Sequence, residues 1–153
     1  MEHATDTTSL TIRDATLNDA PDLAALMGEL GYETTPTQME QRLNRILTNP
    51  TFKTFLAVVD GRACGMIGTV AYPTYEQNGL SGKILALVTA RATRRHGIGR
   101  ALIAAAENDF AQRGIKQVAL NTRLTREDAH KFYEALGYER NGWRFVKHLA
   151  TAK

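Results

Sequence analysis

In Leu85-Ala-Leu-Val-Thr-Ala-Arg-Ala-Thr-Arg-Arg-His-Gly-Ile-Gly-Arg-Ala-Leu102, an apolar run leads into a basic turn with two glycines, Gly97 and Gly99. The apolar residues that follow recur at helical spacing, so we expect a helix directly after the turn. Glycines let a ligand come close to the backbone, and the first helical turn offers N–H groups without helical partners. The arginines add positive charge. The stretch therefore predicts a site for a phosphate group at the start of a helix.

The composition is that of an ordinary globular domain. The chain has 153 residues, of which 43% are apolar and 23% charged, and its net charge is +3. We expect one domain over residues 8–149, with loose termini at residues 1–7 and 150–153. The small charge excess permits an anionic ligand. Because no polybasic tail accompanies it, we expect no nucleic-acid partner.

Two further features bear on the surroundings of the protein. Cys64 is the only cysteine, which excludes an intramolecular disulfide and fits a reducing compartment. Its place in an apolar strand-like run favours a packing residue over a nucleophile. No run approaches the roughly 18 apolar residues that cross a bilayer, and the first residues lack the apolar core of a secretory signal. We therefore expect a cytoplasmic protein without a membrane partner.

Periodicity along the chain predicts an α+β fold. Apolar runs predict strands over residues 9–13, 55–59, 62–72, 83–90 and 115–120, and one or two more over 138–149. Helical spacing predicts four helices. The first ends at Gly31, and the second begins at a capping box over 37–40. The third follows Gly97, and the fourth runs over 125–136. The order β-α-α-β-β-β-α-β-α-β-β predicts a mostly antiparallel central sheet flanked by helices. A right-handed crossover should join the strands at 83–90 and 115–120.

Two well-known phosphate-binding loops do not match the glycine turn. The dinucleotide fingerprint needs a third small residue where Leu102 stands, and the Walker A loop needs a Gly-Lys-Ser/Thr sequence. What remains is Arg94-x-x-Gly97-x-Gly99 between a buried strand and an alanine-rich helix. Alone, this motif is weak, because a Gly-x-Gly before a helix also occurs as a simple tight connection.

A second motif lies downstream, Phe132-Tyr133-Glu-Ala-Leu-Gly137-Tyr138. The pair of motifs, their separation and the order of strands resemble the GNAT family of N-acetyltransferases over residues 8–149. The resemblance implies the acyl-CoA N-acyltransferase fold, with acetyl-CoA as cosubstrate. The stretches at 126–133 and 143–147 are similar to the branch that includes aminoalkylphosphonate acetyltransferases.

The resemblance also implies roles for individual residues. Backbone amides of the turn would hold the pyrophosphate of acetyl-CoA, and the strand at 87–89 would pair with its pantetheine arm and polarise the thioester. Tyr133 would protonate the departing thiolate, as a phenol that is neutral at pH 7 can do. The residues implied at the cosubstrate are Leu87, Val88, Thr89, Arg94, Arg95, His96, Gly97, Ile98, Gly99, Arg100, Asn121, Arg126 and Tyr133.

Several of these residues have a plainer interpretation. Tyr133 lies on the apolar face of its predicted helix, so a buried structural tyrosine is the alternative. The arginines of the turn could form a solvated basic face. Asn121 is a substitute for a family asparagine, because Arg126 stands at that position here.

The usual catalytic base is missing. Many relatives carry glutamates where this chain has Lys83 and Leu85, and leucine cannot take a proton from the attacking amine. Glu76 in the preceding loop, or an ordered water chain, would serve instead.

We therefore expect a metal-independent N-acetyltransferase that moves the acetyl group from acetyl-CoA directly to a primary amine of a small molecule. An aminophosphonate or a polyamine-like compound is the first candidate, and a peptide N-terminus or protein lysine stays open. The acceptor would lie against the first two helices and the loop at 72–82. The alternative is a non-catalytic, regulatory acyl-CoA-binding module. Homodimers are common among relatives, so a homodimer is also possible.

Overall fold

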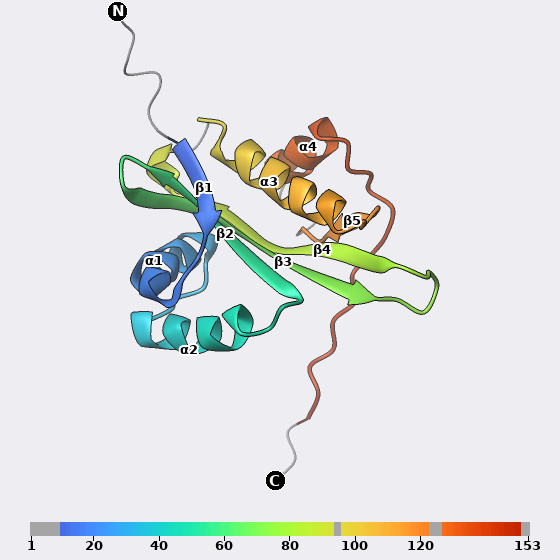
Figure 1. Cartoon of the computed structure of the whole chain (residues 1–153), viewed down its shortest axis with the longest axis horizontal. Helices are drawn as coiled ribbons and strands as arrows, with labels where there is room; N and C mark the ends of the chain where they lie inside the picture. Colours follow the sequence, from blue (N-terminus) through green and yellow to red (C-terminus); the bar gives the residue numbers. More distant parts are fainter. Residues whose placement is uncertain (1–9, 94–95, 123–126, 151–153) are drawn as a thin grey trace, which may run out of the picture. The chain divides into compact units, whose positions relative to one another are not determined.

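The computed structural model of the chain describes residues 10–93, 96–122 and 127–150 (Figure 1). Its contacts divide the chain into two units, Met1–Ala119 and Leu120–Lys153. Most regular structure belongs to the first unit: β1 (Leu10–Asp14), a 3-10 turn (Leu17–Asp19), α1 (Ala20–Leu30), α2 (Pro36–Leu47), β2 (Phe52–Val59), β3 (Arg62–Pro73), β4 (Leu80–Thr89), a second 3-10 turn (Arg91–Thr93) and α3 (Ile98–Gln112). Strand β5 (Val118–Leu120) lies at the border, and α4 (Glu127–Ala135) belongs to the second unit.

The strands form one sheet in the order β1-β2-β3-β4-β5. Neighbours from β1 to β4 are antiparallel. Strand β5 follows β4 through α3, the kind of crossover connection that joins parallel strands. The sheet is therefore mixed and mostly antiparallel, and the predicted α+β class is confirmed. In Figure 1, α1 and α2 lie on one face of the sheet and α3 lies on the other.

The hairpin between β2 and β3 forms where Asp60-Gly61 predicts it. These residues have φ values of 52° and 80°, which is the left-handed pair that a two-residue hairpin of type I′ needs. Pairing starts at once, with Val59 opposite Arg62.

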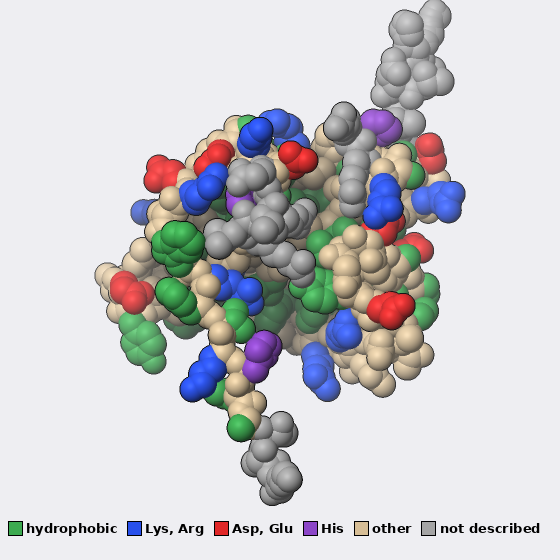
Figure 2. All heavy atoms as spheres, turned by 180° about the vertical axis from the view of Figure 1, so that it is seen from behind, with side chains coloured by type: hydrophobic (Ala, Val, Ile, Leu, Met, Phe, Trp, Pro, Cys, Tyr) green, Lys and Arg blue, Asp and Glu red, His purple; other side chains and the backbone are tan. Residues whose placement is uncertain are grey.

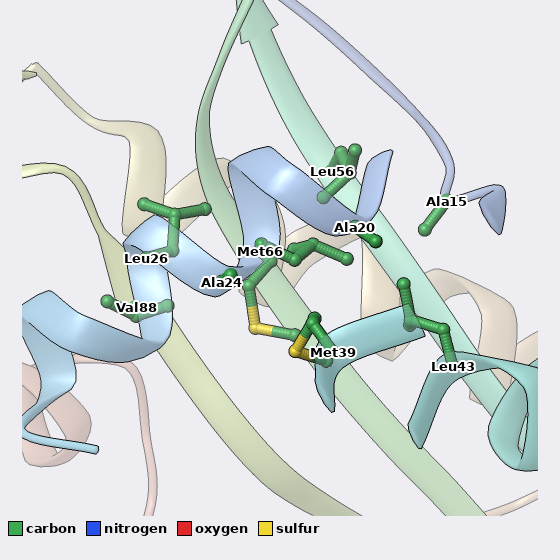
Figure 3. Packing of buried hydrophobic residues seen from close by; sticks show 10 residues of the cluster. Ala15, Ala20, Ala24, Leu26, Met39, Leu43, Leu56, Met66 and Val88 are labelled. Carbon is green, nitrogen blue, oxygen red and sulfur yellow. The ribbon is translucent and has the colours of Figure 1, made fainter. Parts of the chain in front are cut away.

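The core between α1, α2 and the sheet is built from side chains that meet across elements. Leu23 of α1 and Leu43 of α2 are almost completely buried, as is Leu56 of β2. Met66 and Val88 are directly opposite each other on β3 and β4 and join the same cluster. Figure 3 shows the thioethers of Met39 and Met66 turned toward each other beneath α1. Pairs on one face of neighbouring strands stabilise both the sheet and the layer above it.

The opposite face holds α3 through close contact at two glycines. A Cβ at Gly65 would lie 3.1 Å from side-chain atoms of Ile98 and Leu102, and one at Gly82 would lie 2.8 Å from the ring of Phe110. Both strand positions therefore need glycine for α3 to lie this close to the sheet.

The predicted start of the second helix is wrong. The capping box is formed by Thr35 and Gln38, not by the residues at 37–40: the Gln38 N–H donates to the Thr35 hydroxyl at 3.1 Å, and the Thr35 N–H donates to Gln38 Oε1 at 3.0 Å. Pro36 occupies the first helical position. Proline is favoured there because its missing N–H would have no helical partner, which moves the cap one residue before it.

Strand ends also differ from the prediction. Strand β2 begins at Phe52 and β4 at Leu80, because antiparallel pairing with β3 extends as far as Pro73 opposite Leu80. The predicted loop at 74–82 is shortened accordingly. Within the described residues 121–150 there is no strand, so the one or two strands predicted over 138–149 are not found. An apolar pattern suits a strand, but a strand forms only when its backbone groups pair with a neighbour.

The surface carries charges of both signs. On the face seen in Figure 2, Lys and Arg side chains are interspersed with Asp and Glu side chains. Among the helices that the structure describes, none has the length and apolar character needed to cross a membrane.

Candidate functional site

The outer edge of β4 carries backbone groups that face away from β3. The Ala90 N–H donates to the Cys64 carbonyl at 2.7 Å, which makes these two residues a hydrogen-bonded pair. Bonded and non-bonded pairs alternate along an antiparallel ladder. The N–H and C=O groups of Leu87 and Thr89 therefore point to the outer edge, whereas those of Val88 point to β3. Of the three residues predicted to pair with a pantetheine arm, two thus present their backbones where an arm can lie.

Cys64, on β3 beside this edge, is a packing residue as the sequence predicts. Its thiol is buried and donates to the Ala57 carbonyl at 3.4 Å. Burial raises the pKa of the Cys64 thiol, which keeps it protonated and unreactive.

The predicted phosphate turn ends at Gly97, directly before α3. Gly97 has a φ of 76° and caps α3 without a side-chain hydrogen bond. A Cβ at Gly97 would meet nothing within 4 Å, so the space beside it is open. His96 and Arg100 are exposed, whereas the Ile98 side chain is buried. The first N–H groups of the 15-residue α3 are thus available to an anion. Arg94 and Arg95 lie outside the described residues.

A long-range hydrogen bond holds the beginning of the turn. The Glu29 carboxylate, in the last turn of α1, accepts from the backbone N–H of Arg91 at 2.6 Å. Thr93 closes the short 3-10 turn by donating from its hydroxyl to the Ala90 carbonyl at 3.0 Å. The end of β4 is therefore tied to α1 just before the segment that leads to Gly97.

A pocket of about 180 Å³ lies between α1, α2 and strands β2 to β4. Its lining is mostly apolar and has two cations, Arg42 and Lys53, and two threonines, Thr54 and Thr69; the other lining residues are Met27, Met39, Leu43, Ile46, Phe52, Met66, Gly68, Leu85 and Ala86. None of these lining residues is acidic.

Leu85 reaches this pocket because β4 contains an irregularity. Gly68 is opposite Ala86 and Thr69 is opposite Ile84, so Leu85 is the extra residue of a bulge. It is 50% exposed and lines the pocket. The position where many relatives carry a carboxylate thus points to the pocket and is apolar.

The other predicted residues lie elsewhere. Glu76 and Tyr75 are exposed in the turn between β3 and β4, and neither lines the pocket. Pro73, where the turn begins, is opposite Leu80, and Leu80 precedes the bulge residue Leu85 by five residues of β4. At the rise of a strand, this separates the turn from the bulge by about 17 Å. Tyr72 is half-buried at the end of β3. A role for Glu76 as base stays a prediction.

In the second unit, Tyr133 lies on α4 and is half-buried. Its ring makes edge contacts with Phe132, at 5.2 Å between centroids, and with Tyr138, at 6.0 Å. The Tyr138 N–H donates to the Tyr133 carbonyl at 3.1 Å, where Gly137 with a φ of 96° ends the helix. Asn121 is exposed after β5, and Arg126 lies outside the described residues. The roles of Tyr133 and Asn121 stay predictions.

The sequence and fold can now be compared with known proteins. Residues 20–138 match the acetyltransferase (GNAT) family. The chain belongs to the GNAT acetyltransferase family. It is therefore an acyltransferase of the family whose acetyl donor is acetyl-CoA.

Relatives of this GNAT protein include characterised enzymes and solved structures. It is 32% identical over 140 residues to an aminoalkylphosphonate N-acetyltransferase of Salmonella typhimurium, with 90% of each chain covered. A GNAT family acetyltransferase of Staphylococcus aureus superposes with a TM-score of 0.80 at 26% identity, over 92% of this chain and 99% of that one. An aminoglycoside N-acetyltransferase in complex with CoA shares the fold, with a TM-score of 0.82 at 18% identity, over 94% and 97%.

Sequence reasoning missed two residues of the pocket. Arg42 reads as one more charge on the polar face of a surface helix, and Thr69 as an ordinary strand residue. Only the packing of α2 against α1 and β2 brings Arg42 to the same cavity as residues of β3.

Proposed function

We propose that this GNAT protein transfers the acetyl group of acetyl-CoA directly to the primary amine of a small molecule. One observation carries the proposal: the outward backbone groups of Leu87 and Thr89 lead, along the same chain segment, to the start of α3 at Gly97, where no side chain caps the first N–H groups. The strand edge suits the amide-rich pantetheine arm, and the helix start suits the pyrophosphate. The strand edge comes before the helix start along the chain, and in acetyl-CoA the pantetheine arm likewise comes between the thioester and the pyrophosphate.

The reaction is a single displacement. The amine nitrogen attacks the thioester carbon, and a backbone N–H on the β4 edge stabilises the oxyanion that forms. The carbon–sulfur bond then breaks, and the Tyr133 hydroxyl donates its proton to the leaving sulfur. The nitrogen releases its extra proton to water, and water returns a proton to Tyr133. No covalent intermediate with the protein is needed.

Water is the better candidate for the proton acceptor than Glu76. Glu76 is exposed in the turn after β3 and is not among the residues that line the pocket, and none of the lining residues is acidic. The amine must then enter the pocket neutral. We expect kcat/KM for the acceptor to rise about tenfold for each pH unit below the pKa of the free amine, and Glu76→Gln to leave this profile in place.

The pocket at Leu85 supports a small acceptor. Its volume of about 180 Å³ corresponds to about six water molecules of liquid volume. Leu85 and Ala86, which line it, directly precede Leu87 on the β4 edge. An acceptor in the pocket would therefore have its amine beside the thioester. The Salmonella relative acts, by its name, on aminoalkylphosphonates, so short amines of this class are the first acceptors to test.

The deciding experiment measures CoA release with a panel of amines and identifies the products by mass spectrometry. The panel should contain 2-aminoethylphosphonate, a diamine, an aminoglycoside and a lysine-containing peptide. Acetylation of a short amine, with slower reaction of the larger acceptors, supports the proposal. Tight acetyl-CoA binding without acetyl transfer to any amine would instead favour a regulatory acyl-CoA-binding module, which the missing carboxylate at Leu85 makes a real alternative.

A further inference from the structure

The two cations that line the pocket differ in their partners. The Lys53 ammonium forms an ion pair with Asp14 at 3.3 Å, and it also lies 5.5 Å from the centre of the Phe55 ring. Arg42 donates one N–H to the neutral Thr34 hydroxyl at 3.2 Å. Among the ion pairs of the described residues, none involves Arg42. Since a guanidinium has five N–H donors, most of its bonding capacity and all of its charge stay available.

Thr69 of β3, next to the bulge, does not add a second polar side chain to this pocket. Thr69 is 1% exposed, and its hydroxyl is buried without a hydrogen-bond partner. Its side chain shares the face of Ala71, which packs against Phe110 of α3, because strand residues two apart point to the same side of the sheet. Thr69 is beside the bulge at Leu85, at the β4 end of the pocket, whereas Arg42 is on the exposed side of α2. The pocket thus has an outer cation that forms no ion pair among the described residues, with apolar side chains around it.

We propose that Arg42 binds an anionic group of the acceptor and thereby selects short amines that carry a phosphonate or carboxylate at the end opposite the amine. This inference rests on the proposed acetyl transfer. With the anion at Arg42, the alkyl part lies against Met27, Met39 and Leu85, and the amine reaches the β4 end of the pocket. A planar guanidinium suits this role, because its fork of donors can hold two oxygens of one anion.

The test compares three acceptors of similar length: 2-aminoethylphosphonate, β-alanine and the neutral propylamine. Arg42→Gln should lower the preference for the phosphonate over propylamine, measured as the ratio of kcat/KM values, about 10- to 100-fold, as expected for loss of a hydrogen bond to a charged group. The preference for β-alanine over propylamine should fall in the same direction. Arg45→Gln is the matched control, because it removes the same charge from an exposed position of α2 that does not line the pocket.

A binding measurement separates this inference from the acetyl transfer itself. Calorimetry with 2-aminoethylphosphonate is done in the presence of CoA, so that no acetyl transfer occurs. The wild type and the Arg45→Gln protein should bind the phosphonate with similar affinity. Arg42→Gln should bind it about 10- to 100-fold more weakly, the same factor as in the kinetic test. An unchanged acceptor preference in Arg42→Gln, equal losses in both variants, or no binding of the phosphonate to the wild type would overturn the role of Arg42. Binding to Arg42 without acetylation of any amine would leave that role standing and remove the proposed reaction.

Discussion

Gly97 combines an unusual backbone geometry with a place in the proposed binding site. Its φ of 76° disfavours most side chains, and the space where a Cβ would lie is open. Gly97→Val would place a side chain in the path of a pyrophosphate bound at this turn. The structure adds that valine would also be strained in this conformation, so that a loss of binding could come from misfolding.

Asparagine separates the two effects at Gly97, because it tolerates a left-handed conformation. We expect Gly97→Asn to weaken acetyl-CoA binding at least about tenfold, the cost of one lost hydrogen bond to a charged group. Gly114→Asn is the control: Gly114 has a φ of 78°, open space around its Cβ position, and lies after the other end of α3. Both variants should lose similar thermal stability. If both bind acetyl-CoA like the wild type, as judged by calorimetry, the turn is not the pyrophosphate site.

Tyr133, on α4, allows a test of the proposed general acid at the same scale. Tyr133→Phe keeps the ring and its edge contacts with Phe132 and Tyr138, and removes only the hydroxyl. We expect kcat to fall about 100-fold or more, the usual contribution of a general acid, with little change in acetyl-CoA affinity. Tyr138→Phe removes a neighbouring hydroxyl and should have a much smaller effect on kcat. A kcat that Tyr133→Phe leaves unchanged across the pH range would restore the structural interpretation of this tyrosine.

At the scale of elements, α1 and the end of β4 are connected by Glu29. Its carboxylate accepts from the Arg91 N–H at 2.6 Å, at the point where β4 gives way to the turn. The carboxylate thus fixes the position of the backbone just after β4, before the glycine-containing turn. A defect in this bond should act on the pyrophosphate of acetyl-CoA, which we propose the turn to bind.

Glu29→Ala should therefore raise the KM for acetyl-CoA by about threefold to tenfold, while leaving the KM for acetyl-pantetheine, which lacks the pyrophosphate, nearly unchanged. Glu29→Gln keeps an oxygen that can accept the hydrogen bond and should restore most of the affinity. Equal effects of Glu29→Ala on both donors would show that the residue merely supports α1.

For the whole molecule, Asp19 couples the first strand to the helical layer. It is buried, and its carboxylate accepts two hydrogen bonds from Arg13 of β1 at 2.9 Å and one from the Thr16 N–H at 2.8 Å. The hydrogen bonds from Arg13 hold the pKa of Asp19 below its ordinary value, against the opposing effect of burial. A lowered folded pKa means that the ionised carboxylate stabilises the fold above about pH 4, the unfolded value.

We expect Asp19→Asn to lower the free energy of unfolding by about 1–2 kcal/mol near pH 7; solvent reduces the effect, since the Arg13 side chain is half-exposed. The loss should shrink as the pH falls below about 4, because the Asp19 carboxylate then becomes protonated in the unfolded chain and, at still lower pH, in the folded protein. Urea unfolding at pH 7 and at pH 3 measures this difference. A loss of equal size at both values would mean that the charge of Asp19 contributes nothing.

The sequence alone predicts the features that depend on neighbouring residues. The Asp60-Gly61 hairpin, the end of α1 at Gly31 and the glycine turn before α3 all follow from local backbone preferences, and the structure confirms them. The periodicity of apolar residues identifies β3 and the helices for the same reason. The predicted capping box and the strands over 138–149 are wrong because several local choices were possible, and only pairing or a neighbouring proline decides among them.

Tertiary structure decided the features that join distant segments. Arg42, Thr69 and Leu85 come from three elements and meet in one pocket only because α2 packs over a sheet in which β4 bulges. Glu29 and Arg91 are 62 residues apart. The chain segment from Leu85 to Leu102 thus encodes its own strand, turn and helix through local preferences. The pocket proposed for the acceptor depends on strand register and helix packing, which are long-range interactions that no local pattern contains.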